Sequence, residues 1–136
     1  METTYSLSVI VPVYNEADLV LPSTAVIDDF CAQHFRDYEV VIIESGSTDE
    51  TGKKCDEVMR DRPHVRVIHE GARNGFGSAV RLGYQAATKD LILLTTFDLP
   101  FSLDSTLVAL PHLESCDYVV SYRSADTRKW TRRVQS

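Results

Sequence analysis

Nearly continuous apolar runs recur along the chain and predict buried β-strands. The first of them, LSVIVPV at residues 7–13, lacks the alternation of a half-exposed strand and is typical of a strand covered on both faces. Similar β-rich runs follow at residues 38–43, 65–69, 91–95 and 118–121. We therefore predict five strands.

Four stretches between these runs carry signals of α-helices. Apolar side chains recur at helical spacing over about residues 20–34, where Pro22 suits the first turn. A second helix can be capped by Ser47 or Thr48 and ends near Arg60. Two further helices are predicted at about residues 78–88 and 103–113.

Strands that alternate with helices predict an α/β fold with βαβ crossovers and a mostly parallel sheet. In such sheets, ligands bind beyond the carboxyl ends of the strands. Four polar loops lie near that edge of the predicted sheet, at residues 14–16, 44–47, 73–77 and 96–100. We expect these loops to converge on one binding site.

The composition fits one globular domain. The chain has 136 residues, of which 43% are hydrophobic and 25% are charged, enough for a single core. Its three cysteines show no CxxC spacing, which argues against a structural zinc site and favours buried thiols in a reducing compartment. No apolar run approaches the ~20 residues of a membrane span, and the N-terminus lacks a basic leader region. We therefore expect a cytoplasmic protein.

The net charge of −6 is distributed unevenly. Residues 122–136 carry five basic side chains against one aspartate, whereas the body of the chain is acidic. An acidic body argues against nucleic-acid binding, because such binding rests on the neutralisation of phosphates by basic groups. The basic tail suits a phosphate group or an anionic membrane surface, although a solvated tail explains the same composition.

The loop after the second predicted strand combines a carboxylate with a turn. Glu44 leaves a buried strand, where a carboxylate can accept hydrogen bonds from ribose hydroxyls or from a base N–H. Gly46 permits a tight turn, and the start of the next helix offers free backbone N–H groups to an anion. A helix cap with an incidental glutamate remains the alternative explanation.

A glycine-rich stretch precedes the third predicted helix. Gly75 and Gly77 do not form a dinucleotide-binding fingerprint, because Val80 stands where a third small residue belongs. With Arg73 and Arg81 nearby, these glycines would let the backbone approach a sugar or a diphosphate. A flexible loop that enters a helix explains them equally well.

Asp98 is the only acidic residue in the loop after the fourth predicted strand. A carboxylate at that edge can bind a divalent cation that bridges phosphates, or it can accept a hydrogen bond from a sugar hydroxyl. The four histidines are scattered without metal-ligand spacing, so we interpret them as structural or surface residues. The sequence contains no nucleophile elbow, no P-loop and no serine-triad order.

Five segments together resemble the family 2 glycosyltransferases. They read SVIVPVYNEADLV, EVVIIESGSTDET, RNGFGSAVRLGYQAA, DLILLTTFDLP and DYVVSYR, and they cover about residues 6–123 in the family's order and spacing. The sequence looks most like the polyprenyl-phosphate branch, which includes dolichyl-phosphate mannose and glucose synthases. The resemblance implies a GT-A fold with a Rossmann-like nucleotide-sugar-binding core at residues 1–121. Residues 122–136 would begin a membrane-facing acceptor half, of which most is absent from this chain.

The resemblance also implies roles for individual residues. The nucleoside would be bound by residues of the first two loops, namely Pro12, Tyr14, Asn15, Glu16, Glu44, Ser45, Gly46 and Ser47. The donor sugar and its phosphates would lie against Arg73, Gly75, Gly77, Arg81 and Arg123. Glu44 and Ser45 stand where the family usually carries aspartates, so base recognition would have an altered geometry.

The family's metal motif, Asp-x-Asp-x-Gln, reads Thr96-Phe97-Asp98-Leu99-Pro100 in this chain. Asp98 alone remains of three usual ligands, and by the resemblance it would be the metal ligand and catalytic carboxylate for Mg²⁺ or Mn²⁺. If that cation binds weakly, the arginines would compensate the charge of the leaving diphosphate instead.

The implied activity is inverting sugar transfer from a UDP- or GDP-sugar to an acceptor, with a polyprenyl phosphate as the expected acceptor. A phosphate acceptor needs no general base, and the arginines around Trp130 would bind it at the cytosolic membrane face. One alternative is a nucleotide-sugar-binding module without transferase activity. Another is a sugar-phosphate nucleotidyltransferase, but its glycine- and arginine-rich loop does not follow the first strand here. The sequence leaves the donor's base and sugar, and any self-association, open.

Overall fold

Four parallel strands form a single sheet in the computed structural model, which describes residues 4–120. They are β1 (Leu7–Val13), β2 (Tyr38–Glu44), β3 (Val65–His69) and β4 (Leu91–Leu94). The strands lie in the order β3-β2-β1-β4, and each neighbouring pair is parallel. The parallel α/β fold predicted from the alternating runs is thus confirmed.

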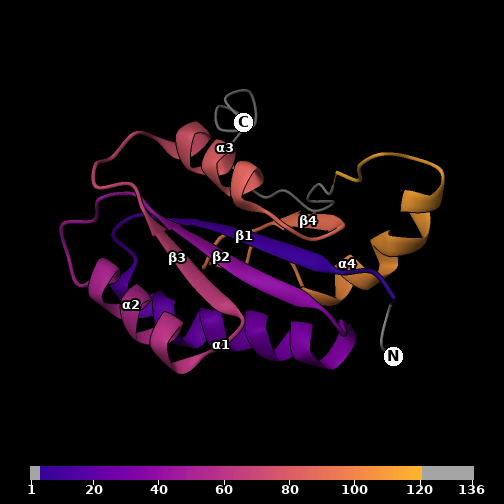
Figure 1. Cartoon of the computed structure of the whole chain (residues 1–136), viewed down its shortest axis with the longest axis horizontal. Helices are drawn as coiled ribbons and strands as arrows, with labels where there is room; N and C mark the ends of the chain where they lie inside the picture. The colour runs from indigo at the N-terminus through magenta and orange to yellow at the C-terminus, as the bar shows by residue number, and fades with distance from the viewer. Residues whose placement is uncertain (1–3, 121–136) are drawn as a thin grey trace, which may run out of the picture. The chain divides into compact units, whose positions relative to one another are not determined.

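Helices cover both faces of this sheet. Two of them, α1 (Ala17–His34) and α2 (Thr51–Asp61), lie on one face, and α3 (Phe76–Ala86) covers the other (Figure 1). The two inner strands, β1 and β2, are therefore buried along their whole length. The chain divides after residue 103 into two compact units, and the second contains α4 (Asp104–Ala109) and the 3-10 helix η1 (Leu110–Glu114).

The face of the sheet beneath α3 is packed around Ile10 of β1. Ile10, Val41 and Ile43 form a buried hydrophobic cluster with Ala79 of α3. Gly83, one turn further along α3, lies directly against Ile10, since a Cβ at position 83 would be 2.1 Å from Ile10 Cγ2. The helix can therefore approach β1 closely only because position 83 has no side chain.

We expect Gly83→Ala to destabilise the protein, although alanine favours helices. The added methyl overlaps the fully buried, stiff side chain of Ile10. This overlap lowers the free energy of unfolding by about 1–3 kcal/mol, whereas the higher helix propensity of alanine raises it by about 0.5–1 kcal/mol. Urea unfolding should therefore show a net loss of about 1–2 kcal/mol. The control is Gly77→Ala, at an open position of the same helix. A Gly83→Ala protein as stable as that control would contradict this packing account.

Two helices begin at different residues from those predicted. α1 begins at Ala17, so Pro22 lies inside the helix instead of in its first turn. α2 begins at Thr51 and has no side-chain cap. The expected capping hydroxyls of Ser47 and Thr48 instead accept hydrogen bonds from the loop after β1, so a tertiary contact replaces the local cap.

Other differences lie further along the chain. α3 begins at Phe76, two residues before its predicted start. The predicted helix at residues 103–113 is divided into α4 and η1, and Pro111, which has no N–H, is the second residue of η1. The predicted strand at residues 118–121 is wrong for residues 118–120, which are exposed and in no strand. Its last position lies outside the described residues. Residues 118–120 have side chains that favour strands, but these side chains are exposed and bury no surface against a sheet.

Candidate functional site

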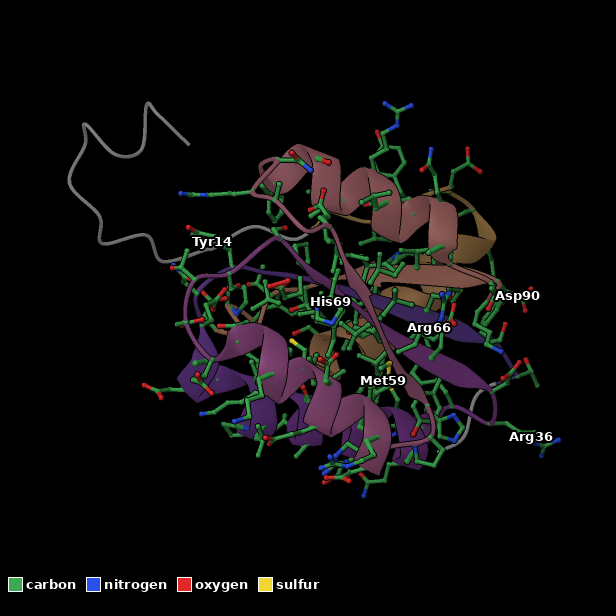
Figure 2. The ribbon with its side chains drawn as sticks, turned by 60° about the vertical axis from the view of Figure 1, so that its left-hand side comes forward. Tyr14, Arg36, Met59, Arg66, His69 and Asp90 are labelled. Atoms are coloured by element: carbon green, nitrogen blue, oxygen red, sulfur yellow. The ribbon has the colours of Figure 1, made fainter. Side chains whose placement is uncertain are left out.

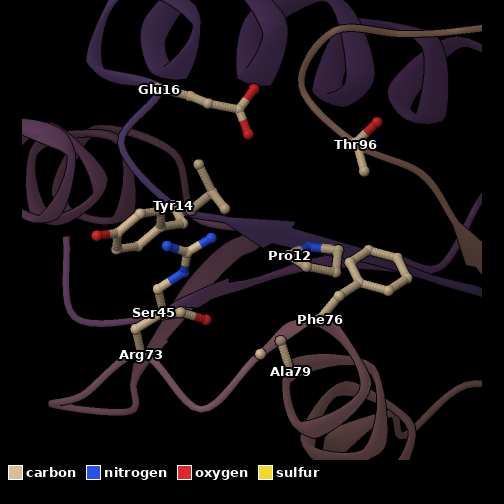
Figure 3. A pocket seen from close by; sticks show the side chains of 10 residues that line it. Pro12, Tyr14, Glu16, Ser45, Arg73, Phe76, Ala79 and Thr96 are labelled. Carbon is tan, nitrogen blue, oxygen red and sulfur yellow. The ribbon is translucent and has the colours of Figure 1, made fainter.

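A pocket of about 280 Å³ opens at the edge of the sheet where the strands' carboxyl ends lie (Figure 3). Its walls come from the four predicted polar loops and from the start of α3, and its lining residues are Pro12, Val13, Tyr14, Glu16, Ser45, Arg73, Gly75, Phe76, Ala79 and Thr96. The four loops thus converge on one pocket, as expected, whereas binding of a ligand there stays a prediction.

The pocket brings together about half of the residues predicted to bind the donor. Those that line it are Pro12, Tyr14, Glu16, Ser45, Arg73 and Gly75. Those that lie within the described chain but do not line it are Asn15, Glu44, Gly46, Ser47, Gly77, Arg81 and Asp98. Arg123 and the rest of the basic segment 122–136 lie outside the described residues. The sequence did not single out three lining residues, Val13, Phe76 and Ala79, whose one signal is that they adjoin the motifs.

Arg73 and Tyr14 form a cation–π pair in this pocket. The Cζ of Arg73 lies 4.2 Å from the centre of the Tyr14 ring, and Figure 3 shows the guanidinium beside the ring. This distance is that of a cation–π contact. Within residues 4–120, no carboxylate forms an ion pair with Arg73. The pair therefore offers a positive charge and an aromatic surface side by side.

Asn15 ties the loop after β1 to the loop after β2. Its backbone adopts a left-handed conformation with φ 50°, which asparagine tolerates better than most residues. Its amide N–H donates to Ser47 Oγ at 3.0 Å, and its side chain exchanges hydrogen bonds of 3.1 and 2.8 Å with Thr48. The next amide, of Glu16, donates to Thr51 Oγ1 at 2.9 Å. These contacts fix the two pocket residues that flank Asn15. Contact of Asn15 or Ser47 with a nucleoside stays a prediction.

Glu44 is 4% exposed, and its own loop engages its carboxylate. Oε1 accepts a hydrogen bond from the Ser47 N–H at 2.7 Å, and Oε2 accepts one from the Gly46 N–H at 3.2 Å. Glu44 therefore orders the turn that leads to α2 and is not incidental, and α2 has no side-chain cap, so the alternative of a helix cap beside an incidental glutamate is wrong. Contact of Glu44 with a base or ribose therefore stays a prediction.

His69 is the last residue of β3 and is labelled in Figure 2. Its ring lies between two carboxylates. Its Nε2 is 2.7 Å from Asp56 Oδ1 of α2, and its Nδ1 is 3.3 Å from Glu44 Oε2. The hydrogen bond to Asp56 and then that to Glu44 raise the pKa of His69 above 6.5, although partial burial opposes the rise. In its protonated form the imidazole therefore links α2 to the turn after β2.

This link gives a pH-dependent contribution to stability. A histidine with a raised folded-state pKa stabilises the protein fully below its unfolded pKa of about 6.5 and loses that contribution as the pH rises through the folded value. We expect His69→Gln to lower the free energy of unfolding more at about pH 5 than at about pH 8. Urea titrations at both pH values measure the two differences. An equal difference at both would show that the imidazole's charge contributes nothing.

The carboxylates of Glu16 and Asp98 interact electrostatically. Burial first, and the negative charge of Asp98 second, raise the pKa of Glu16. Asp98 is exposed and accepts a hydrogen bond from the hydroxyl of Thr96, which lines the pocket. A pair of carboxylates that repel each other attracts a cation. In the described part of the chain, no group of three or more His, Cys, Asp or Glu side chains could hold a metal ion.

The thiols agree only in part with the expectation from the sequence. Cys31 and Cys55 are buried, and burial raises the pKa of both to about 12, so they stay protonated and unreactive. Cys116 is exposed, which corrects the expectation that all three are buried.

None of the helices within residues 4–120 has the length and apolar character needed to cross a membrane.

Comparison with known proteins relates most of the chain to one family. The sequence profile of Glycosyl transferase family 2 matches residues 8–135. The chain is 33% identical over 94 residues to undecaprenyl-phosphate 4-deoxy-4-formamido-L-arabinose transferase of Klebsiella pneumoniae, a match that covers 68% of this chain and 29% of that relative. It is 33% identical over 93 residues to the dolichol-phosphate mannosyltransferase of Pyrococcus furiosus, covering 68% and 26%.

A solved structure has the same fold. A mannosyltransferase from Pyrobaculum calidifontis, in complex with GDP-Man and Mn²⁺, superposes with a TM-score of 0.66 at 28% identity, covering 82% of this chain and 34% of that one. The predicted GT-A architecture is therefore confirmed. These matches span 26–34% of the length of the three proteins.

Proposed function

Because the chain belongs to glycosyl transferase family 2, we propose that its pocket binds the nucleoside diphosphate of an activated sugar. The activity would be transfer of the hexosyl group from this donor to a polyprenyl phosphate. In that reaction an acceptor phosphate oxygen bonds to the anomeric carbon, the bond from this carbon to the diphosphate breaks, and the nucleoside diphosphate leaves. Displacement from the opposite side inverts the anomeric configuration.

The observation that carries this proposal is the Arg73–Tyr14 pair. A guanidinium presents parallel N–H donors to phosphate oxygens, and a tyrosine ring presents an apolar surface to a base. The two groups lie 4.2 Å apart in a pocket that is open to solvent. The chain as a whole carries a net charge of −6, so an anionic donor needs this local positive charge.

We propose that a divalent cation binds beside Asp98. Mg²⁺ at nucleotide sites commonly uses one or two protein carboxylates together with substrate phosphates and water. Asp98 and Glu16 supply two such carboxylates, and burial first and the charge of Asp98 second raise the pKa of Glu16. When bound, the cation would neutralise charge on the leaving diphosphate. Thr96 offers only a hydroxyl where an aspartate is usual, so we expect modest metal dependence.

The acceptor is proposed from the names of the relatives and from chemistry. Two relatives are named for undecaprenyl-phosphate and dolichol-phosphate transfer. A phosphate acceptor is already ionised at neutral pH, so it needs no general base to remove a proton. The pocket would therefore need only to orient the donor and stabilise its leaving group.

A second candidate function is donor binding without transfer. The specific observation in its favour is Thr96, which lines the pocket at the first position of the metal motif without a carboxylate. A protein of this kind would bind a nucleotide sugar but would not stabilise the departing diphosphate.

Transfer of radiolabelled hexose from UDP-glucose or GDP-mannose to a polyprenyl phosphate, in the presence of Mn²⁺, distinguishes the two candidates. Labelled lipid supports the transferase. Donor binding without labelled lipid supports the binding module, and neither binding nor transfer would refute both.

Asp98→Asn should lower the transfer rate about tenfold, because it removes one charge that holds the cation while leaving the side chain's shape. Chelation with EDTA should lower the wild-type rate by a similar factor and should affect the variant less. Glu57→Gln, which removes a charge on α2 outside the pocket, is the matched control. Equal rates for wild type and Asp98→Asn would show that Asp98 has no role in sugar transfer.

A further inference from the structure

Glu70, which follows β3, does not line the pocket but contacts three segments around it. Its Oε1 accepts a hydrogen bond from Ser45 Oγ at 2.7 Å. Its Oε2 accepts one from Ser78 Oγ at 2.9 Å and one from Asn74 Nδ2 at 3.3 Å. One carboxylate thus joins the loop after β2, the loop after β3 and the first turn of α3.

The loop after β3 depends on these contacts for its position. Gly71 and Gly75 have φ angles of 77° and 92° and turn the chain at the two ends of the loop. Between them, the backbone of Ala72 packs on Gly46, because a Cβ at position 46 would be 2.7 Å from Ala72 Cα. All residues from 71 to 77 are exposed, so burial does little to hold the loop.

The loop presents one pocket residue, Arg73, from between its glycines. The guanidinium reaches the ring of Tyr14, which belongs to the loop after β1. The hydrogen bonds that Glu70 accepts from Asn74 and Ser78 tie it to the chain that follows Arg73. The bond that it accepts from Ser45 ties it to the neighbouring loop.

The charge of Glu70 suits this arrangement. Burial raises the pKa of its carboxyl, but the hydrogen bonds from Ser45, Ser78 and Asn74 outweigh burial and keep the pKa below its ordinary value of 4.5. The ionised group can accept from all three donors at once. A glutamine has one acceptor oxygen and would turn its own N–H groups toward one of these donors.

We propose that Glu70 is a positioning residue for donor binding, which fixes the loop at residues 71–75 and thereby holds Arg73 where it contacts the donor's phosphates. This inference rests on the proposed function, because it assumes a nucleoside diphosphate in the pocket. Glu70 itself does not touch the ligand and acts only through Arg73.

The test is a double-mutant cycle of Glu70→Gln and Arg73→Gln, read by calorimetric Kd values for GDP and UDP and for the phosphate-free guanosine and uridine. Arg73→Gln should weaken diphosphate binding about 30-fold, the loss of a hydrogen bond to a charged group, and Glu70→Gln about tenfold. Nucleoside affinity should be unchanged in both. In the double variant, Glu70→Gln should add nothing to the effect of Arg73→Gln.

Two further variants keep the result interpretable. Glu57→Gln removes the same charge on α2 and should leave every Kd unchanged. Ser78→Ala removes one hydrogen bond while leaving the Glu70 charge, and it should weaken diphosphate binding about threefold even if Glu70→Gln fails to fold. Wild-type Kd values with Ser78→Ala and Glu70→Gln would overturn the proposal.

The remaining outcomes also decide it. If Glu70→Gln raises the Kd for nucleosides as much as the Kd for diphosphates, Glu70 supports the fold in general and the proposal is wrong. The same conclusion follows if Glu70→Gln raises the diphosphate Kd as much in the Arg73→Gln variant as in the wild type. If Arg73→Gln has no effect on a wild-type affinity that is measurable, Arg73 does not contact the phosphates, and only this inference fails. If the wild-type chain binds neither GDP nor UDP, the proposed function itself fails.

Discussion

Gly46→Ala should destabilise the protein by about 3 kcal/mol, more than a glycine substitution in an ordinary loop. Position 46 has φ 63°, a left-handed conformation that costs an alanine about 1–2 kcal/mol. The added Cβ would also lie 2.7–2.8 Å from the backbone N, Cα and C of Ala72. Backbone atoms cannot rotate away, so the loop after β3 must shift.

The same shift should weaken binding in the pocket, because Arg73 follows Ala72 directly. We expect the Kd for GDP or UDP to rise at least about tenfold. Gly71→Ala is the matched control, since it has φ 77° but open space around its Cβ. It should cost about 1 kcal/mol in urea unfolding, from the left-handed conformation alone. Equal losses in the two variants would show that the contact between positions 46 and 72 is unimportant.

Glu39→Gln should lower the free energy of unfolding by about 3 kcal/mol at neutral pH. Glu39 is 8% exposed in β2. Its Oε1 accepts hydrogen bonds from Ser8 Oγ at 2.7 Å and from the Thr88 N–H and Oγ1 at 2.8 and 2.9 Å, while its Oε2 accepts one from Arg66 Nε at 2.9 Å. Burial opposes ionisation, but these bonds outweigh it and lower the pKa of Glu39 to about 2.

The pH dependence of this loss identifies its cause. A carboxyl with a lowered folded-state pKa stabilises the protein above its unfolded pKa of 4.5, and that contribution disappears as the pH falls toward 2. The difference between wild type and Glu39→Gln should therefore be constant above about pH 5 and should shrink below it. Glu57→Gln should change stability by less than about 0.5 kcal/mol. A difference for Glu39→Gln that did not depend on pH would attribute the loss to packing and not to charge.

The strands were the most predictable part of the fold. The bounds of β1 and β3 are those predicted, because a strand buried between two layers must be apolar and must end where the apolar run ends. β2 extends one residue further, to Glu44, since the carboxylate finds partners within the turn. The fifth predicted strand failed because β-propensity predicts a strand only where the sheet offers a partner and a face to bury.

Helix starts were less predictable, because a hydroxyl can serve either its own helix or a neighbouring loop. Ser47 and Thr48 have the side chains of helix caps, but both bond to Asn15, more than 30 residues away in sequence. The sequence pattern shows which residues could cap a helix, but it does not show which distant residues they contact in the folded chain.

The candidate site also has a part that the sequence predicts and a part that it does not. The topology alone predicted that four loops would converge, and the motifs within them predicted Tyr14, Glu16 and Arg73. The second layer of contacts was not predictable. Glu70 reads in the sequence as one more surface acid, and His69 as a scattered histidine. Their importance lies in partners 25 residues away, Ser45 and Glu44, that only the folded chain brings near.

Calorimetric titration of the chain with GDP-mannose and UDP-glucose, each with and without Mn²⁺, shows whether the pocket binds a nucleotide sugar. We expect saturable binding to at least one donor, with a lower Kd in the presence of Mn²⁺ and a higher Kd for Arg73→Gln. Binding to neither donor under either condition would contradict the claim that this pocket is a nucleotide-sugar site.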